Sequence, residues 1–68
     1  MVHISVKRCF RLKLNNIPNE INVILLRIDS NGNAMVRGCN TKDIIYFNLN
    51  ELYDSTEYFI EIKCDNCN

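Results

Sequence analysis

The chain has 68 residues, of which 47% are hydrophobic, and its formal net charge is zero. This length makes one domain near the lower limit for a self-sufficient core, and the apolar content excludes a disordered segment. Neutral charge removes the commonest sequence argument for nucleic-acid binding, a globally basic chain. No apolar run approaches the roughly 18–20 residues that cross a bilayer, and no secretory signal is visible. We therefore expect a cytoplasmic protein without membrane contact, a setting in which structural disulfides are disfavoured.

The first segment, residues 2–14, predicts a long amphipathic strand. Its even positions are apolar except Arg8, and its odd positions are polar, small or charged. This period of two is typical of a strand with one buried and one solvated face. An unpaired buried guanidinium would be very costly, so Arg8 either pairs with an acid or marks a bulge or bend next to Cys9. We favour the bulge.

The middle of the chain predicts a hairpin. Pro18 interrupts the pattern within residues 15–19, and residues 21–28 then form an apolar strand that is covered on both faces for part of its length. Asn31 and Gly32 lie between two apolar runs and favour a type I′ turn, in which both central residues need a positive φ. Residues 34–38 form the return strand.

The last third predicts a fourth strand, one helical turn and a closing strand. The fourth strand includes residues 44–47, and Asn48 with Glu51 has the spacing of a capping box for the helical turn at residues 49–53. In the closing strand, residues 56–64, we expect Ile60 and Ile62 to face the core and Phe59 to lie on the polar face.

Five short strands with one helical turn before the last resemble the Src-homology-3-like small barrels in element order. The resemblance implies an all-β fold, a small five-stranded barrel over residues 1–64, followed by a polar tail at residues 65–68. A five-stranded oligonucleotide-binding-type barrel is the next choice, but it usually needs a longer chain with a helix between its third and fourth strands. Many unrelated functions share this architecture, so it does not identify one.

The four cysteines, Cys9, Cys39, Cys64 and Cys67, include one C-x-x-C motif at the end of the chain. This spacing is half of a structural zinc site, and pairing of the first and last strands would bring Cys9 toward Cys64, with His3 as a spare nitrogen ligand. A redox role lacks the helix N-terminus that lowers a thiol pKa. We favour the third interpretation, in which Cys9 and Cys39 are small semi-buried residues and the tail pair is free. We therefore expect no cofactor, with structural zinc as the alternative.

Basic side chains are concentrated at the start of the chain. Residues 1–14 carry four basic residues and no acid, whereas residues 41–68 carry two basic residues against six acids. Lys7, Arg11 and Lys13 could form a phosphate-binding stripe for single-stranded nucleic acid. Alternatively, Glu57 and Glu61 neutralise this stripe from the last strand. We favour neutralisation.

Aromatic residues with acidic neighbours suggest a protein interface instead. Tyr46, Tyr53 and Phe59 are our candidates for partner contacts, because interfaces are enriched in such side chains. The function we predict is a small non-enzymatic module that binds another protein, as an accessory subunit, adaptor or phage-type inhibitor. Nucleic-acid binding through the basic stripe is the alternative.

Catalysis has little support in the sequence. His3 is the only histidine and has no evident nucleophile beside it, and a glycine-rich phosphate loop is absent. We therefore predict that the protein is not an enzyme. We expect a monomer, or a homodimer if the barrel stays open and the first or fourth strand leaves an unpaired edge.

Overall fold

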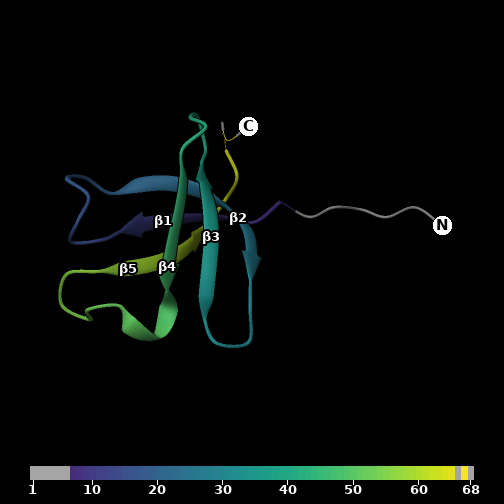
Figure 1. Ribbon diagram of the computed structural model, residues 1–68. Coiled ribbons are helices and arrows are strands. Elements are labelled where there is room, and N and C mark those ends of the chain that lie inside the picture. The colour runs from purple at the N-terminus through teal and green to yellow at the C-terminus, as the bar shows by residue number, and fades with distance from the viewer. Residues whose placement is uncertain (1–6, 66, 68) are drawn as a thin grey trace.

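The fold is a single antiparallel sheet of five strands, shown in Figure 1. The computed structural model describes residues 7–65 and 67. Its elements are β1 (Cys9–Lys13), β2 (Ile21–Ile28), β3 (Asn33–Gly38), β4 (Ile44–Asn48), the 3-10 turn η1 (Leu49–Glu51) and β5 (Tyr58–Ile62). The strands lie side by side in the order β4-β3-β2-β1-β5. The predicted all-β class and the order of elements are confirmed.

The sheet is open, so the predicted closure into a barrel is not confirmed. Its two edges are β4 and β5, which do not pair with each other within the described residues. The first and last strands do pair, as expected, because β1 lies between β2 and β5. Of the two strands named as edges of an unclosed barrel, the fourth is an edge of the sheet, whereas the first lies inside it.

The first strand is shorter than residues 2–14. Residues 2–6, which include His3, lie outside the described residues. The strand β1 begins at Cys9. The bulge predicted beside Arg8 is found instead in β2, where the pairing with β3 shifts between Leu25 and Arg27. Arg8 follows the other predicted alternative and pairs with an acid, Glu61.

The β2–β3 hairpin is confirmed, but its turn differs from the expected two-residue type I′. Three residues separate Asp29 from Asn33, whose backbone carbonyl accepts a hydrogen bond from the Asp29 N–H at 3.1 Å. Gly32 supplies the positive φ, +85°, that a three-residue hairpin loop requires. The Asp29 carboxylate accepts hydrogen bonds from the backbone N–H groups of Asn31 and Asn33. This local bonding selects the longer loop.

The core lies on one face of the sheet. Its fully or nearly buried members are Phe10, Leu12, Leu14, Val23 and Val36. Phe59 packs here as well, with its ring stacked on Phe10 at a centroid distance of 4.0 Å, so it does not lie on a polar face. The reason is the register: Phe59 stands opposite Leu12 and shares its face, which leaves Ile60 exposed. The predicted faces of Phe59 and Ile60 are therefore wrong, whereas Ile62 packs against a second apolar cluster that includes Cys9 and Ile24.

The predicted helical turn forms but is shorter than residues 49–53, since η1 covers Leu49–Glu51, and the capping bond involves Asn50 rather than Glu51. The Asn48 side-chain oxygen accepts a hydrogen bond from the Asn50 N–H at 2.7 Å and so caps η1. Leu52, just after the turn, packs against the core. Among the residues that the structure describes, no helix has the length and apolar character needed to cross a membrane.

Candidate functional site

Among the described residues, no strand pairs with the outer side of β4. The Gly38 N–H donates a hydrogen bond to the Asp43 carbonyl at 3.0 Å, and the register then continues without interruption along β3 and β4. Because hydrogen-bonded positions alternate in an antiparallel pair, Ile45 directs its N–H and C=O groups toward β3. Ile44 and Tyr46 therefore direct theirs toward the open edge.

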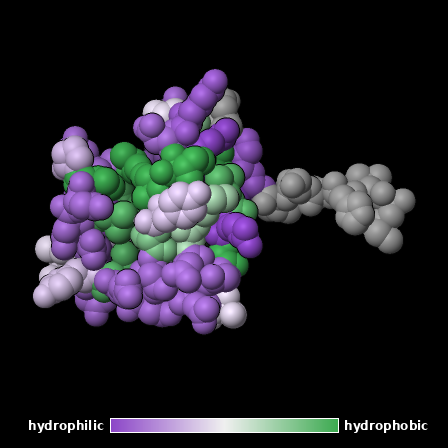
Figure 2. All heavy atoms as spheres, viewed as in Figure 1, coloured by the Kyte–Doolittle hydropathy of each residue, from purple (hydrophilic) through white to green (hydrophobic). Residues whose placement is uncertain are grey.

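The same two residues also expose apolar side chains. Ile44 and Tyr46 have exposed fractions of 44% and 72%, and both lie on the sheet face opposite the core. Met35 stands directly opposite Tyr46 on β3 and extends this area. Figure 2 shows a hydrophobic area over β3 and β4 that is bordered by hydrophilic residues. We call Ile44, Tyr46 and Met35 the β4 edge surface.

A shallow depression adjoins this surface. It has a volume of about 280 Å³, and Tyr46, Met35 and Arg27 are among the residues that line it. Tyr46 was a predicted contact residue, whereas Met35 and Ile44 were not singled out. The signal for Ile44 was present in the sequence: residues 44–47 are all apolar, and a strand in a sheet with one covered face leaves alternate side chains exposed.

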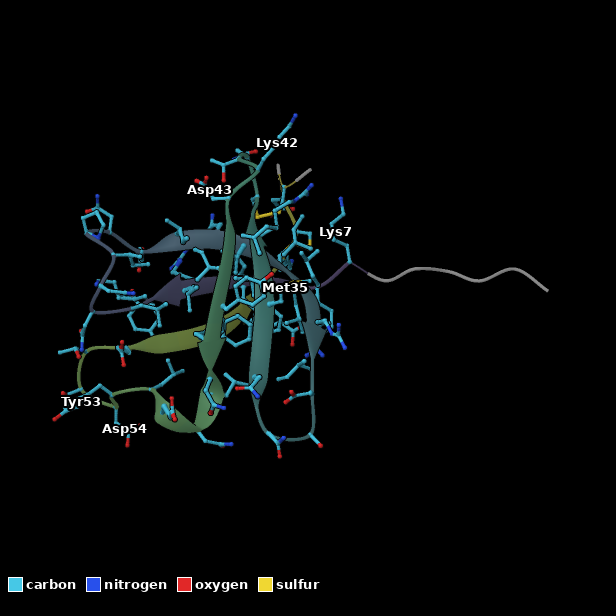
Figure 3. The ribbon with its side chains drawn as sticks, viewed as in Figure 1. Lys7, Met35, Lys42, Asp43, Tyr53 and Asp54 are labelled. Atoms are coloured by element: carbon cyan, nitrogen blue, oxygen red, sulfur yellow. A yellow bond between two sulfur atoms is a disulfide. The ribbon has the colours of Figure 1, made fainter. Side chains whose placement is uncertain are left out.

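The other predicted partner-contact residues are not brought to this surface. Tyr53 is 68% exposed in the turn after η1, and Figure 3 shows it at the periphery, far from Met35. Its backbone N–H donates to Glu57 at 2.7 Å. Phe59 packs within the core, where it also meets Phe47 in an edge-on arrangement at 5.0 Å. Its aromatic ring is therefore part of the scaffold.

The three residues of the predicted phosphate-binding stripe have internal partners. Lys13 Nζ donates to the carbonyls of Leu14 and Ile17 at 2.7 and 3.0 Å. Arg11 Nε lies 3.7 Å from a carboxylate oxygen of Glu20. Figure 3 labels the third residue, Lys7, whose Nζ donates to the Cys67 carbonyl at 3.3 Å. Internal acceptors thus engage all three.

The acids that were expected to neutralise the stripe have different roles. Glu61 accepts two hydrogen bonds from the Arg8 guanidinium, which lowers the pKa of Glu61 and raises that of Arg8. Glu57 accepts hydrogen bonds from the backbone N–H groups of Asn15 and Tyr53, and these lower its pKa. The main role of Glu57 is therefore to connect the loop at Asn15 with the turn at Tyr53, rather than to neutralise a basic side chain.

Glu20 is the acid that faces Arg11. Its carboxylate also accepts a hydrogen bond from the Tyr58 hydroxyl, and this bond raises the pKa of Tyr58. The Arg11, Glu20 and Tyr58 side chains thus form one exposed chain of contacts that links β1, the start of β2 and β5. The sequence did not indicate Glu20 as a partner.

The four cysteines form two disulfides. Cys9 is bonded to Cys64, and Cys39 to Cys67, so the expectation of a free tail pair is wrong. The expected approach of Cys9 to Cys64 is confirmed. Both bonds lie at one end of the sheet, on the face opposite the main core, where Ile24 packs against them. The sulfur atoms of Cys9, Cys39 and Cys67 lie within 4.8 Å of one another.

The arrangement thus combines an apolar edge strand with a sulfur cluster and with basic side chains that have internal partners. Comparisons of the chain with models of protein families, with curated proteins and with solved structures find no match.

Proposed function

We propose that the protein is a non-enzymatic binding module that takes an extended segment of another protein as a further strand along β4. The observation that carries this proposal is the coincidence at Ile44 and Tyr46 of outward-directed backbone groups with exposed apolar side chains. Strand addition at an open edge needs both, because backbone hydrogen bonds supply affinity and alternate side chains supply specificity.

The geometry defines the kind of segment that fits. An added strand would pair its own N–H and C=O groups with those of Ile44 and Tyr46, and each such bond contributes about 0.5–1.5 kcal/mol net. The side chains on one face of the segment would cover the β4 edge surface. We therefore expect a partner segment with apolar residues at alternate positions.

A Src-homology-3-like plan is the fold that we propose for this scaffold. Its support is the strand order, in which β1 pairs with both β2 and β5 and a single 3-10 turn precedes β5. Such an architecture provides a rigid frame on which function depends on the exposed site. In this protein the exposed site is the edge of β4.

The nucleic-acid alternative has weaker support. Lys13 and Lys7 donate to backbone carbonyls, and Arg11 faces Glu20, so phosphate contacts would have to displace internal partners. Affinity for nucleic acid depends on basic groups that are available to phosphates. We therefore place the partner among proteins.

A proline scan combined with a displayed library of extended peptides tests the proposal. Tyr46→Pro removes the outward N–H, and proline is tolerated where that N–H faces solvent. We expect selected peptides to bind the unaltered protein, to bind Tyr53→Ala equally well and to lose at least about tenfold affinity for Tyr46→Pro. Peptides that bind Tyr46→Pro equally well would refute strand addition. A dimer that dissociates on this substitution would show that β4 pairs with a second copy.

A further inference from the structure

The two disulfides bring together a set of sulfur atoms that fits a second chemical state. The four cysteines come from distant positions: the start of β1, the residue after β3, and two positions beyond β5. Cys9 and Cys39 are buried, with exposed fractions of 1% and 5%. The sheet pairing of β1 with β2 and β5 positions Cys9 independently of any sulfur–sulfur bond.

We propose that the reduced protein binds one zinc ion through the thiolates of Cys9, Cys39, Cys64 and Cys67, and that oxidation replaces the ion with the two disulfides. In a tetrahedral zinc–thiolate site the metal–sulfur distance is about 2.3 Å, which places the sulfurs about 3.8 Å apart. Three of the four sulfurs already lie within 4.8 Å of one another. The fourth, that of Cys64, is bonded to Cys9. Small side-chain adjustments therefore suffice.

Two further features suit a metal ion. Cys64 and Cys67 have the C-x-x-C spacing with which structural zinc sites commonly begin or end. Lys7 Nζ lies 3.3 Å from the Cys67 carbonyl, so a cation stands beside a cluster that would carry two net negative charges as a zinc tetrathiolate. The neighbouring Ile24 and Ile62 side chains cover the cluster with apolar surface.

The interconversion balances with simple reagents. A phosphine reduces each disulfide with one water molecule, which gives two thiols and the phosphine oxide. One Zn²⁺ then displaces four protons from four thiols to form the tetrathiolate. In the reverse direction, two molecules of hydrogen peroxide accept four electrons and take up four protons. This step yields the two disulfides, free Zn²⁺ and four water molecules.

Either state would join the same three parts of the molecule. A small domain needs such a covalent or metal link, because its core alone supplies little stability. Disulfides persist in oxidising compartments and zinc tetrathiolates in reducing ones, so the same four residues would stabilise the sheet in both settings. The prediction of a cytoplasmic location and the two disulfides are then compatible.

Native mass spectrometry of the full chain tests the proposal directly. The oxidised protein is expected to carry no metal, and the phosphine-reduced protein is expected to take up one Zn²⁺ per chain. With Co²⁺ instead, absorption bands of a tetrahedral cobalt tetrathiolate should appear. A reduced chain that holds no zinc, or that gives an octahedral cobalt spectrum, would overturn the proposal. Two equivalents of peroxide should then release one zinc ion per chain to a chelating dye, and retention of the metal would contradict the exchange.

Two substitutions of one ligand separate metal binding from disulfide formation. Cys39→His keeps four zinc ligands of an accepted kind but cannot form the second disulfide. We expect it to bind zinc in the reduced state, whereas Cys39→Ser should lose at least about tenfold zinc affinity. Equal zinc affinity in Cys39→Ser would exclude Cys39 as a ligand. If Cys39→Ser does not fold, the histidine variant decides, because failure of a folded Cys39→His chain to bind zinc would count against the site.

Discussion

Arg8 and Glu61 form a two-pronged pair between the residue before β1 and β5, with Nε to Oε2 and Nη2 to Oε1 distances of 3.1 Å each. The pair resolves an inconsistency in the sequence, where Arg8 occupies a position that the alternation reserves for buried side chains. Both side chains are about half exposed, so solvent and salt screen their attraction. The pair therefore fixes the position of Arg8 more than it stabilises the fold.

Stability should fall as the solution becomes acidic. The pKa values of Asp29, Glu57 and Glu61 are lowered from their ordinary values of 3.8, 4.5 and 4.5 by hydrogen bonds that exist in the folded state. Their contribution is complete above those ordinary values and is lost as the pH falls through the lower folded-state values. Chemical denaturation from pH 6 to about pH 2 should show this loss. Glu57→Gln should reduce the change in the free energy of unfolding over this pH range. An unchanged pH dependence would contradict the role given to Glu57.

Amide hydrogen exchange should alternate along β4. The N–H groups of Ile44 and Tyr46 face the open edge and should exchange fast, whereas those of Ile45 and Phe47 bond to β3 and should exchange slowly. Residue-resolved NMR measures this directly. Uniform protection along the strand would mean that the edge is already paired.

Proline at two adjacent positions of β4 should destabilise the fold to different extents. Ile45→Pro removes a bond of the β3–β4 ladder and leaves its acceptor on β3 without a partner, which should cost about 1–3 kcal/mol, whereas Tyr46→Pro removes an N–H that faces the open edge and should cost less. Urea denaturation of the two variants gives the comparison. Similar costs at both positions would contradict the assigned direction of the backbone groups.

Breaking the disulfides in the absence of zinc should destabilise the protein. The Cys9–Cys64 and Cys39–Cys67 bonds span 55 and 28 residues, which gives about 4 and 3.5 kcal/mol for each bond taken alone. Replacing each cysteine pair by alanines in turn, with thermal unfolding as the measurement, should therefore give the larger loss for Cys9–Cys64. The reverse order would show that strain or residual unfolded structure outweighs loop length.

Two aromatic truncations should differ in their effect on stability. Phe59→Ala removes a ring that packs on Phe10 and Phe47 and should cost about 3 kcal/mol. Tyr53→Ala removes an exposed ring and should change stability by about 0.5 kcal/mol or less. Denaturant midpoints of the two variants provide the measurement. A small cost for Phe59→Ala would contradict the packing of its ring in the core and would support a role in partner contacts.

The sequence was informative where the chemistry is local. Residues 21–28 are rich in apolar side chains that favour strands, and the observed strand β2 has the same bounds. Asn48 likewise caps η1 with its side chain, and Gly32 supplies the positive φ of the hairpin loop. Such features depend on a few neighbouring residues, so a single sequence contains them.

The errors arise where distant segments decide. The face of Phe59 depends on the register of β5 against β1, and a change of one residue moves every side chain to the other face. The pairing of Cys39 with Cys67 depends on the path of the chain after β5, which no local sequence pattern specifies. The edge position of β4 follows from the open sheet, whereas the element order led us to predict a closed barrel.

The Cys9–Cys64 bond has a mechanical consequence. A force that pulls the two ends of the chain apart is transmitted from residue 9 to residue 64 through this covalent bond, so the segment between them carries no load. Under tension the oxidised molecule would keep its sheet intact, because residues 9–64 would not be extended. The reduced, metal-free chain would extend strand by strand, which makes the sulfur cluster the element that determines whether the protein yields to force.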